Sequence, residues 1–150
     1  MRTFILGLIG LTAACAPQYS QTQLEPGTPF PINEARFDER PEQLHLAFRA
    51  SCQGPADSYS DRGADEAICQ MIPPPDVAAG LIVQFDGALE VPMIVVERMT
   101  RKVDDGYVVG ISYFATVPKK SGNDQRVYLR SRGLDRIIEN LFRAYGGRPI

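Results

Sequence analysis

Three aspartates, each four residues after the last, have a spacing that suggests metal chemistry. Asp57, Asp61 and Asp65 lie in a stretch rich in Gly, Pro, Ser and Asp. A calcium loop starting at Asp57 would need glycine at its sixth position and a carboxylate at its twelfth, and Arg62 and Ile68 stand there. We therefore expect a solvated acidic loop and assign no metal.

A second candidate cluster depends on how two strands pair. A three-residue turn at Asp104-Asp105-Gly106 would place Glu97 and Arg101 on the same face as Tyr113. Such a group could bind a ligand or act as a general acid with its modulator. The alternative is a salt bridge at the edge of the sheet.

Common catalytic motifs are absent from the sequence. It contains no G-x-S-x-G, no phosphate-binding glycine loop and no H-E-x-x-H. The sequence therefore predicts neither an enzyme nor a cofactor.

The first fifteen residues have the pattern of a targeting segment. Arg2 is followed by the apolar run Phe4 to Leu11 and by Thr12-Ala13-Ala14-Cys15. Eight apolar residues form about 12 Å of helix, too little to cross a bilayer. This stretch resembles the signal peptide and lipobox of a bacterial lipoprotein, although Thr12 stands where that family usually has leucine. Ordinary secretory cleavage after Ala16 is disfavoured by Pro17.

The resemblance implies an anchor and a location. Cys15 would become the first residue of the mature chain, with a thioether-linked diacylglycerol and a fatty acid such as palmitate on its amine. Ala16 after the cysteine is no inner-membrane retention signal in that family. We therefore expect a lipid-anchored protein on the periplasmic face of the outer membrane.

The two remaining cysteines can form one disulfide. An oxidising periplasm favours a bond between Cys52 and Cys69. A metal site is the alternative, but it needs two more ligands, and His45 is the only histidine.

Composition divides the chain into three parts. Residues 1–14 are the expected signal peptide. Residues 15–42 are the lipidated Cys15 and a Pro- and Gln-rich tether, whose last third is expected to dock through Phe30, Ile32 and Phe37. Residues 43–150 are enough for one small domain.

The first half of that domain contains short elements. Leu44, Leu46 and Phe48 alternate with polar residues, which predicts a strand with His45 exposed. The stretch 64–71 is typical of a short helix ended by prolines. Asp76 and the alanines after it favour a second helix over 77–85, with a strand as the alternative.

The second half contains a hairpin, a strand and a helix. The hairpin runs from Val91 to Val117, and the register with a three-residue turn is preferred because a two-residue Asp-Gly turn would put Lys102, Thr100 and Arg98 among core residues. Residues 125–130 read as another strand. Apolar residues at helical spacing predict a C-terminal amphipathic helix: Leu134, Ile137, Ile138, Leu141, Phe142 and Tyr145. The expected fold is α+β, a small antiparallel sheet of three to four strands with this helix and one or two short helices packed on it.

Charge is divided between the two halves of the chain. Residues 16–97 carry a formal net charge of −9 and residues 98–150 one of +6. The basic half could meet anionic lipid, cell-wall carboxylates or an acidic partner. Mutual neutralisation across the fold is the alternative. The basic candidates are Arg98, Arg101, Lys102, Lys119, Lys120, Arg126, Arg130 and Arg132.

Two functions remain open. The favoured one is a membrane-anchored periplasmic lipoprotein that acts as a binding or adaptor module for an envelope protein or a cell-wall component, with no nucleic acid among its partners. The alternative is a small periplasmic hydrolase or hydrolase inhibitor, which needs Glu97, Asp104, Asp105 or the acidic loop to line a cleft.

Overall fold

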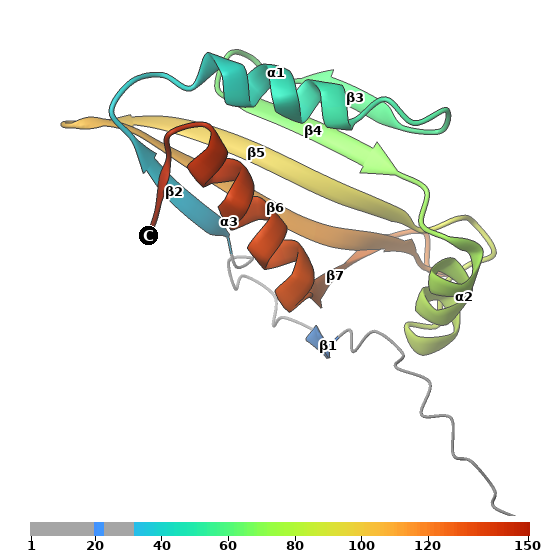
Figure 1. Ribbon diagram of the computed structural model, residues 1–150. Coiled ribbons are helices and arrows are strands. Elements are labelled where there is room, and N and C mark those ends of the chain that lie inside the picture. Colours follow the sequence, from blue (N-terminus) through green and yellow to red (C-terminus); the bar gives the residue numbers. More distant parts are fainter. Residues whose placement is uncertain (1–19, 23–31) are drawn as a thin grey trace, which may run out of the picture.

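The computed structural model describes residues 20–22 and 32–150, and these form an α+β fold. Figure 1 shows the sheet with its helices. In chain order the elements are β1 (Ser20–Thr22), β2 (Asn33–Phe37), α1 (Glu42–Ser51), β3 (Ser58–Asp61), β4 (Glu66–Met71), α2 (Pro75–Gln84), β5 (Met93–Val103), β6 (Gly106–Pro118), β7 (Asp124–Arg130), α3 (Arg132–Ala144) and β8 (Arg148–Pro149).

The sheet is larger than the three to four strands expected. Eight strands pair, all antiparallel, in the order β1-β7-β6-β5-β4-β3, and β2 lies between β6 and β8. The long strand β6 makes this possible because it pairs with β2 along its first half and with β7 along its second half. The short strands β1, β3 and β8 escaped prediction because two to four residues carry almost no periodicity.

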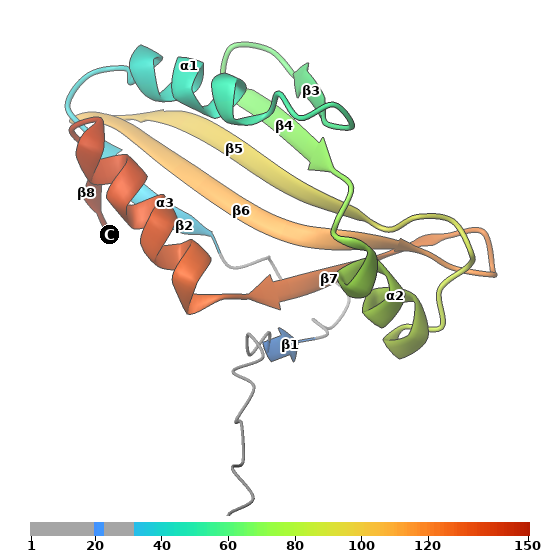
Figure 2. The same ribbon diagram turned by 45° about the vertical axis from the view of Figure 1, so that its right-hand side comes forward.

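All three helices pack against one face of the sheet, which we call the helix-covered face. In β6 this face carries alternate residues from Tyr107 to Val117, and in β5 those from Ile94 to Lys102. Leu44 of α1, Leu81 of α2 and Phe142 of α3 are buried in one cluster with the β6 residues. In Figure 2, α1 lies above the β4–β5 side of the sheet and α3 crosses β2 and β6.

The segment predicted as a strand around His45 is the helix α1, so that prediction is wrong. Leu44 and Phe48 are buried and one helical turn apart, whereas Leu46 is exposed. Leu44 and Phe48, two of the three alternating apolar residues, are four positions apart, which is also the spacing of one face of a helix. Residues 42–51 include no β-branched side chain, which favours the helix.

The segment predicted as a helix over 64–71 is the strand β4, so that prediction is also wrong. Ala67 and Cys69 are buried on the helix-covered face, and Ile68 is buried on the other face. A strand buried on both faces shows no alternation, and pairing with β5 overrides the helix preference of its residues. The helix expected over 77–85 is present as α2, which begins at Pro75 with Asp76 in its first turn.

The hairpin is present in a third register, two residues away from the rejected Asp105-Gly106 turn, and it puts the same β5 residues among the core residues as that turn would. The turn is Asp104-Asp105, Val103 pairs with Gly106, and Arg98 pairs with Ile111. Arg98 and Thr100 therefore lie on the helix-covered face and are buried, with 1% and 6% of their surface exposed. At Gly106, φ is +128°, and a Cβ would collide with the carbonyl oxygen of Phe37, so glycine is required there.

A helix, α3, is present where the C-terminal amphipathic helix was expected, but only part of the predicted apolar stripe is core. Ile138 and Phe142 are buried, whereas Ile137 is 64% exposed and Tyr145 is 39% exposed. Strand β8 follows it and pairs with β2, so α3 is not the last element.

The folded region begins before the predicted boundary at residue 43. Strand β2 pairs with β6, Phe37 is buried, and Gly147 lies against its ring. Residues 33–42 of the predicted tether therefore belong to the folded region. The predicted signal peptide, Cys15 and Phe30 lie outside the described residues, whereas β1 and Ile32 are described. Among the helices that are described, none is long and apolar enough to cross a membrane.

Candidate functional site: a pocket beneath the first helix

A polar group lies inside the protein where α1 crosses β5. Leu44 and Phe48 hold α1 on the sheet, and His45 between them points to β5. Nη1 of Arg98 donates to Nε2 of His45 and, at 2.8 Å, to Oγ1 of Thr100. The backbone of β5 also places Arg98 beside Ala67 of β4, whose small side chain leaves room for the guanidinium.

The guanidinium of Arg98 forms no ion pair with a described carboxylate; burial lowers its pKa, and Asp61 and Asp65 favour its charge only through space. Both of its hydrogen bonds come from Nη1 and go to neutral acceptors. Nε of Arg98 is the one buried side-chain nitrogen or oxygen of the described residues without a hydrogen-bond partner. Burial of an uncompensated cation is costly and calls for an explanation.

Arg98 forms the floor of a pocket of about 440 Å³. Helix α1 gives one wall, strand β3 and the loop after it give the other, and the rest of the lining is Arg40, Glu42, His45, Leu46, Arg49, Tyr59, Asp61, Gly63 and Ala64. Three of these ten residues are arginines, and only two are acidic. The pocket therefore suits an anion.

Most of the charges at the rim already have partners. Arg40 bonds to Glu42 at 2.8 Å and to Asp65 at 2.9 Å. Tyr59 donates to Asp61 at 2.5 Å, and both burial and this bond raise the pKa of the Tyr59 hydroxyl. Arg49 lies over the Tyr59 ring, 5.6 Å from its centre. Arg98 and Arg49 are thus the pocket cations without an ion pair to a described residue, and Arg98 is the buried one of the two.

His45 is neutral near pH 7. Burial lowers its pKa, and the adjacent Arg98 guanidinium lowers it further. Because arginine can only donate, Nε2 of His45 must accept the bond from Arg98, and the ring proton is on Nδ1. Nδ1 lies 3.9 Å from a carboxylate oxygen of Glu42.

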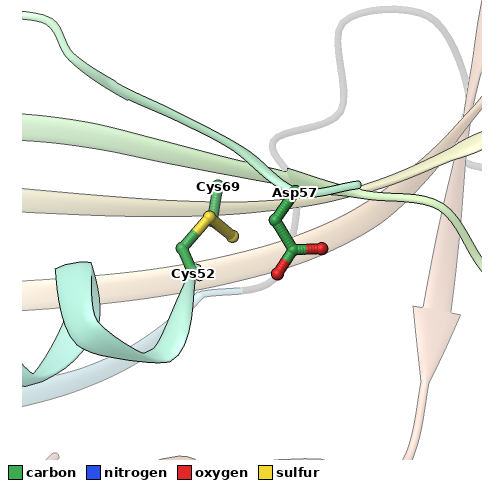
Figure 3. A group of neighbouring side chains, drawn as sticks. All are labelled: Cys52, Asp57 and Cys69. Atoms are coloured by element: carbon green, nitrogen blue, oxygen red, sulfur yellow. A yellow bond between two sulfur atoms is a disulfide. The ribbon is translucent and has the colours of Figure 1, made fainter. Parts of the chain in front are cut away.

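The predicted disulfide is confirmed, and it ties the end of α1 to the sheet. Cys52 at the end of α1 is bonded to Cys69 of β4 (Figure 3). Asp57 lies close to both sulfurs, and these three form the one group of three metal-ligating side chains found among the described residues. While the sulfurs are bonded to each other they are not thiolate ligands. The bond therefore fixes α1 to the sheet beside the pocket.

The three aspartates of the acidic loop have different partners. Asp57 accepts from the backbone of Gly54, Asp61 from Tyr59, and Asp65 pairs with Arg40. Only Asp61 lines the pocket.

The predicted basic surface is not a single patch. Lys102 pairs with Tyr107 at the start of β6, whereas Lys119 and Lys120 follow its end, on the order of 40 Å away along the strand. Lys119 donates to the carbonyl of Phe85.

Acidic residues of the first half of the chain instead pair with basic residues of the second half. These pairs are Glu34 with Arg101, Asp38 with Arg148, and Asp86 with Lys120. The alternative of neutralisation across the fold describes these contacts better than a separated basic face.

The cluster predicted from Glu97, Arg101 and Tyr113 is also not formed. Glu97 and Arg101 lie on the face opposite Tyr113 because Glu97 pairs with Ser112. Tyr113 is buried and holds the start of α3: its hydroxyl donates to Asp135 at 2.9 Å and accepts from the Ser131 backbone at 3.0 Å. Burial, with the bond to Asp135, raises its pKa to about 12.

Of the predicted binding residues only Arg98, which was expected at the surface, belongs to the pocket, and of the acidic loop only Asp61 does. His45, Arg40, Arg49 and Tyr59 were missed. One sequence signal was available. Arg98 and Thr100 stand at alternate positions of β5 opposite apolar residues of β6, and this pattern is compatible with a buried polar site as well as with a different strand register.

Comparisons with known proteins found no match among family models, curated proteins or solved structures. The pocket itself is therefore the basis for a proposed function.

Proposed function

We propose that this protein is a lipid-anchored binding module of the periplasm, in which the pocket beneath α1 receives an anionic group of its ligand. The buried guanidinium of Arg98 at the pocket floor carries the proposal. A cation held there without an ion-pair partner destabilises the fold until an anion neutralises it. Ligand pockets characteristically combine apolar walls with a few fixed polar groups of this kind.

The anchored part of the proposal rests on the leader. A lipidated Cys15 would hold the protein at the periplasmic face of the outer membrane, with two or three acyl chains giving stable attachment. The segment between Cys15 and β2 would then set how far the pocket stands from the bilayer. The partners we propose are an envelope protein or a cell-wall component.

The hydrolase alternative gains less support. Glu97 lies on the face opposite the helices, Asp104 and Asp105 form the exposed hairpin turn, and none of the three lines the pocket. Of the acidic residues that do, Glu42 is paired with Arg40 and Asp61 with Tyr59. Neither is held as an unpaired acid or base.

The test is crosslinking in intact cells, followed by separation of membrane and soluble fractions. We expect Cys15→Ser to leave the membrane fraction. We expect Arg98→Met to remain there but to lose the crosslinked envelope partner. Lys102→Met is the matched control because it removes an exposed cation from the same strand, and it should keep both properties. Unchanged crosslinking of Arg98→Met would contradict the proposal.

A further inference from the structure

One end of the Arg98 guanidinium can still take a ligand. Nη1 is used by His45 and Thr100, whereas Nε and Nη2 donate to no described residue. Because Nε is closed to solvent, a ligand in the pocket would meet the Nη1–Nη2 end. The hydrogens of that end point in parallel, about as far apart as the two oxygens of a carboxylate, so it suits a planar anion once Nη1 gives up its bond to His45.

The charge of the pocket favours a single negative charge. Arg40 is already neutralised by Glu42 and Asp65, and the three arginines and two acidic residues of the lining leave a net charge of +1. Glu42 and Asp61 line the same pocket and would repel a dianion. The ring of Tyr59 and the exposed side chain of Leu46 offer apolar contact to the rest of the ligand.

His45 restricts how the anion can be held. Its Nε2 now accepts from Arg98, and Thr100 Oγ1 lies 3.2 Å from the same nitrogen. A carboxylate that enters between the imidazole and the guanidinium breaks the bond from Arg98 to His45. The imidazole then needs a proton on Nε2 to donate to the carboxylate.

We propose that the pocket binds a monocarboxylate between Arg98 and His45, and that binding takes up one proton from solvent onto Nε2 of His45. This inference rests on the proposed function, since it names the anionic group. Two N–H groups of Arg98 donate to the carboxylate oxygens, and Nε2 of His45 donates to one of them. No covalent bond is made or broken except N–H at His45.

The charged and polar groups around His45 come from three elements. Glu42, one turn earlier in α1, favours the protonated ring, and Arg40 before α1 opposes it. Asp65 in the loop between β3 and β4 also favours protonation, and Arg98 of β5 opposes it. Thr100 of β5 supplies a neutral hydroxyl. A carboxylate on Arg98 cancels the largest opposing charge in this set, so proton uptake and ligand binding reinforce each other.

The first experiment measures binding of benzoate and of its neutral analogue benzamide to the full chain in detergent. Both are flat, and they differ mainly in charge. We expect benzoate to bind and benzamide to bind at least about tenfold more weakly. Equal binding would overturn the carboxylate assignment. Tighter binding of dimethyl phosphate would also overturn it, while leaving an anion pocket and the proposed function intact; failure of every anion would remove both.

The second arm asks where the carboxylate comes from. A short N-acetylated peptide with a free C-terminal carboxylate is compared with its C-terminal amide and with benzoate. Preference for the peptide acid indicates a chain terminus as ligand, and preference for benzoate indicates a free small acid. Either result supports the carboxylate site.

The last arm follows the proton. His45 is the only histidine, so the histidine NMR signals of the chain report it alone. We expect benzoate to raise the pH at which His45 titrates, and benzoate affinity to rise from pH 7.0 to pH 5.5, by at most about tenfold per pH unit for one proton. His45→Gln keeps a hydrogen-bond acceptor for Arg98 and should bind benzoate without this pH dependence. Wild-type affinity that does not change with pH would overturn the proton uptake, whether or not the variant folds.

Discussion

The guanidinium of Arg98 donates to the neutral imidazole of His45 and forms no ion pair with a described carboxylate. The contact joins the centre of α1 to the centre of β5 across the helix-covered face. In a protein interior, arginine is normally paired with an acid, because desolvation of its charge is otherwise uncompensated. A histidine partner leaves the positive charge in place for a ligand, and it makes the contact sensitive to pH.

The stability of the protein should fall as the pH is lowered from 7 toward 5. His45 has a lowered pKa in the folded state because it is buried beside Arg98, so the unfolded chain binds the proton more readily. The stabilisation is present above the unfolded pKa of about 6.5 and is lost as the pH falls through the folded value. Linkage limits the slope to about 1.4 kcal/mol per pH unit for one group. Urea unfolding at several pH values measures it.

The control for this pH dependence of stability is His45→Gln, because glutamine does not titrate. The decline between pH 7 and pH 5 should largely disappear, and only the loss at lower pH from carboxylates such as Asp38 and Asp86, whose pKa values are lowered by Arg148 and Lys120, should remain. An equally steep decline in His45→Gln would show that another group is responsible.

Removal of the disulfide should weaken the pocket as well as the fold. The double variant Cys52→Ala/Cys69→Ala is expected to lose about 3 kcal/mol of unfolding free energy, because the bond closes a chain loop with a sequence separation of 17. Since Cys52 ends α1, benzoate should also bind more weakly. Urea unfolding and calorimetry check the two effects. A variant as stable as wild type would contradict this account of how α1 is held.

Tyr113→Phe should destabilise the protein without affecting the pocket. The Tyr113 hydroxyl bonds to Asp135 and to the Ser131 backbone, at the start of α3. Its loss leaves a partly buried N–H without that acceptor and should cost about 1–2 kcal/mol. Thermal unfolding measures the cost, and benzoate affinity should remain that of wild type. A loss of affinity would mean that α3 also shapes the pocket.

Local pattern predicted the elements whose residues agree with their surroundings. Helix α3 was predicted from its apolar spacing, α2 from its alanines, and the β5–β6 hairpin from its turn residues. The disulfide followed from having two cysteines for one bond. In each case a short stretch of sequence carries the deciding information.

Long-range pairing decided the rest. The register of β5 on β6 could not be derived from local sequence because the observed register buries Arg98. The hydrogen bond that this burial requires is accepted by His45, which is 53 residues away in the chain. The segment of α1 was predicted as a strand and that of β4 as a helix because tertiary contacts decide both structures. The sheet buries Leu44 and Phe48 of α1, and β4 pairs with a strand on each side. The pocket is formed by α1, β3, the loop after β3 and β5, so it could not be predicted while α1 was assigned as a strand, β3 as a loop and β5 to another register.

The most direct test of the account is the unfolding free energy of Arg98→Met compared with that of the chain that keeps Arg98, with and without benzoate, both in a chain that carries Cys15→Ser. If Arg98 is kept for binding, its removal should stabilise the empty protein by about 1–3 kcal/mol. Thr100 can still donate to His45 across 3.2 Å, so no new unsatisfied group arises there. Benzoate should then raise the unfolding free energy only of the chain that keeps Arg98. Destabilisation of Arg98→Met by several kcal/mol, with no effect of benzoate on either protein, would show that Arg98 serves the fold and not a ligand.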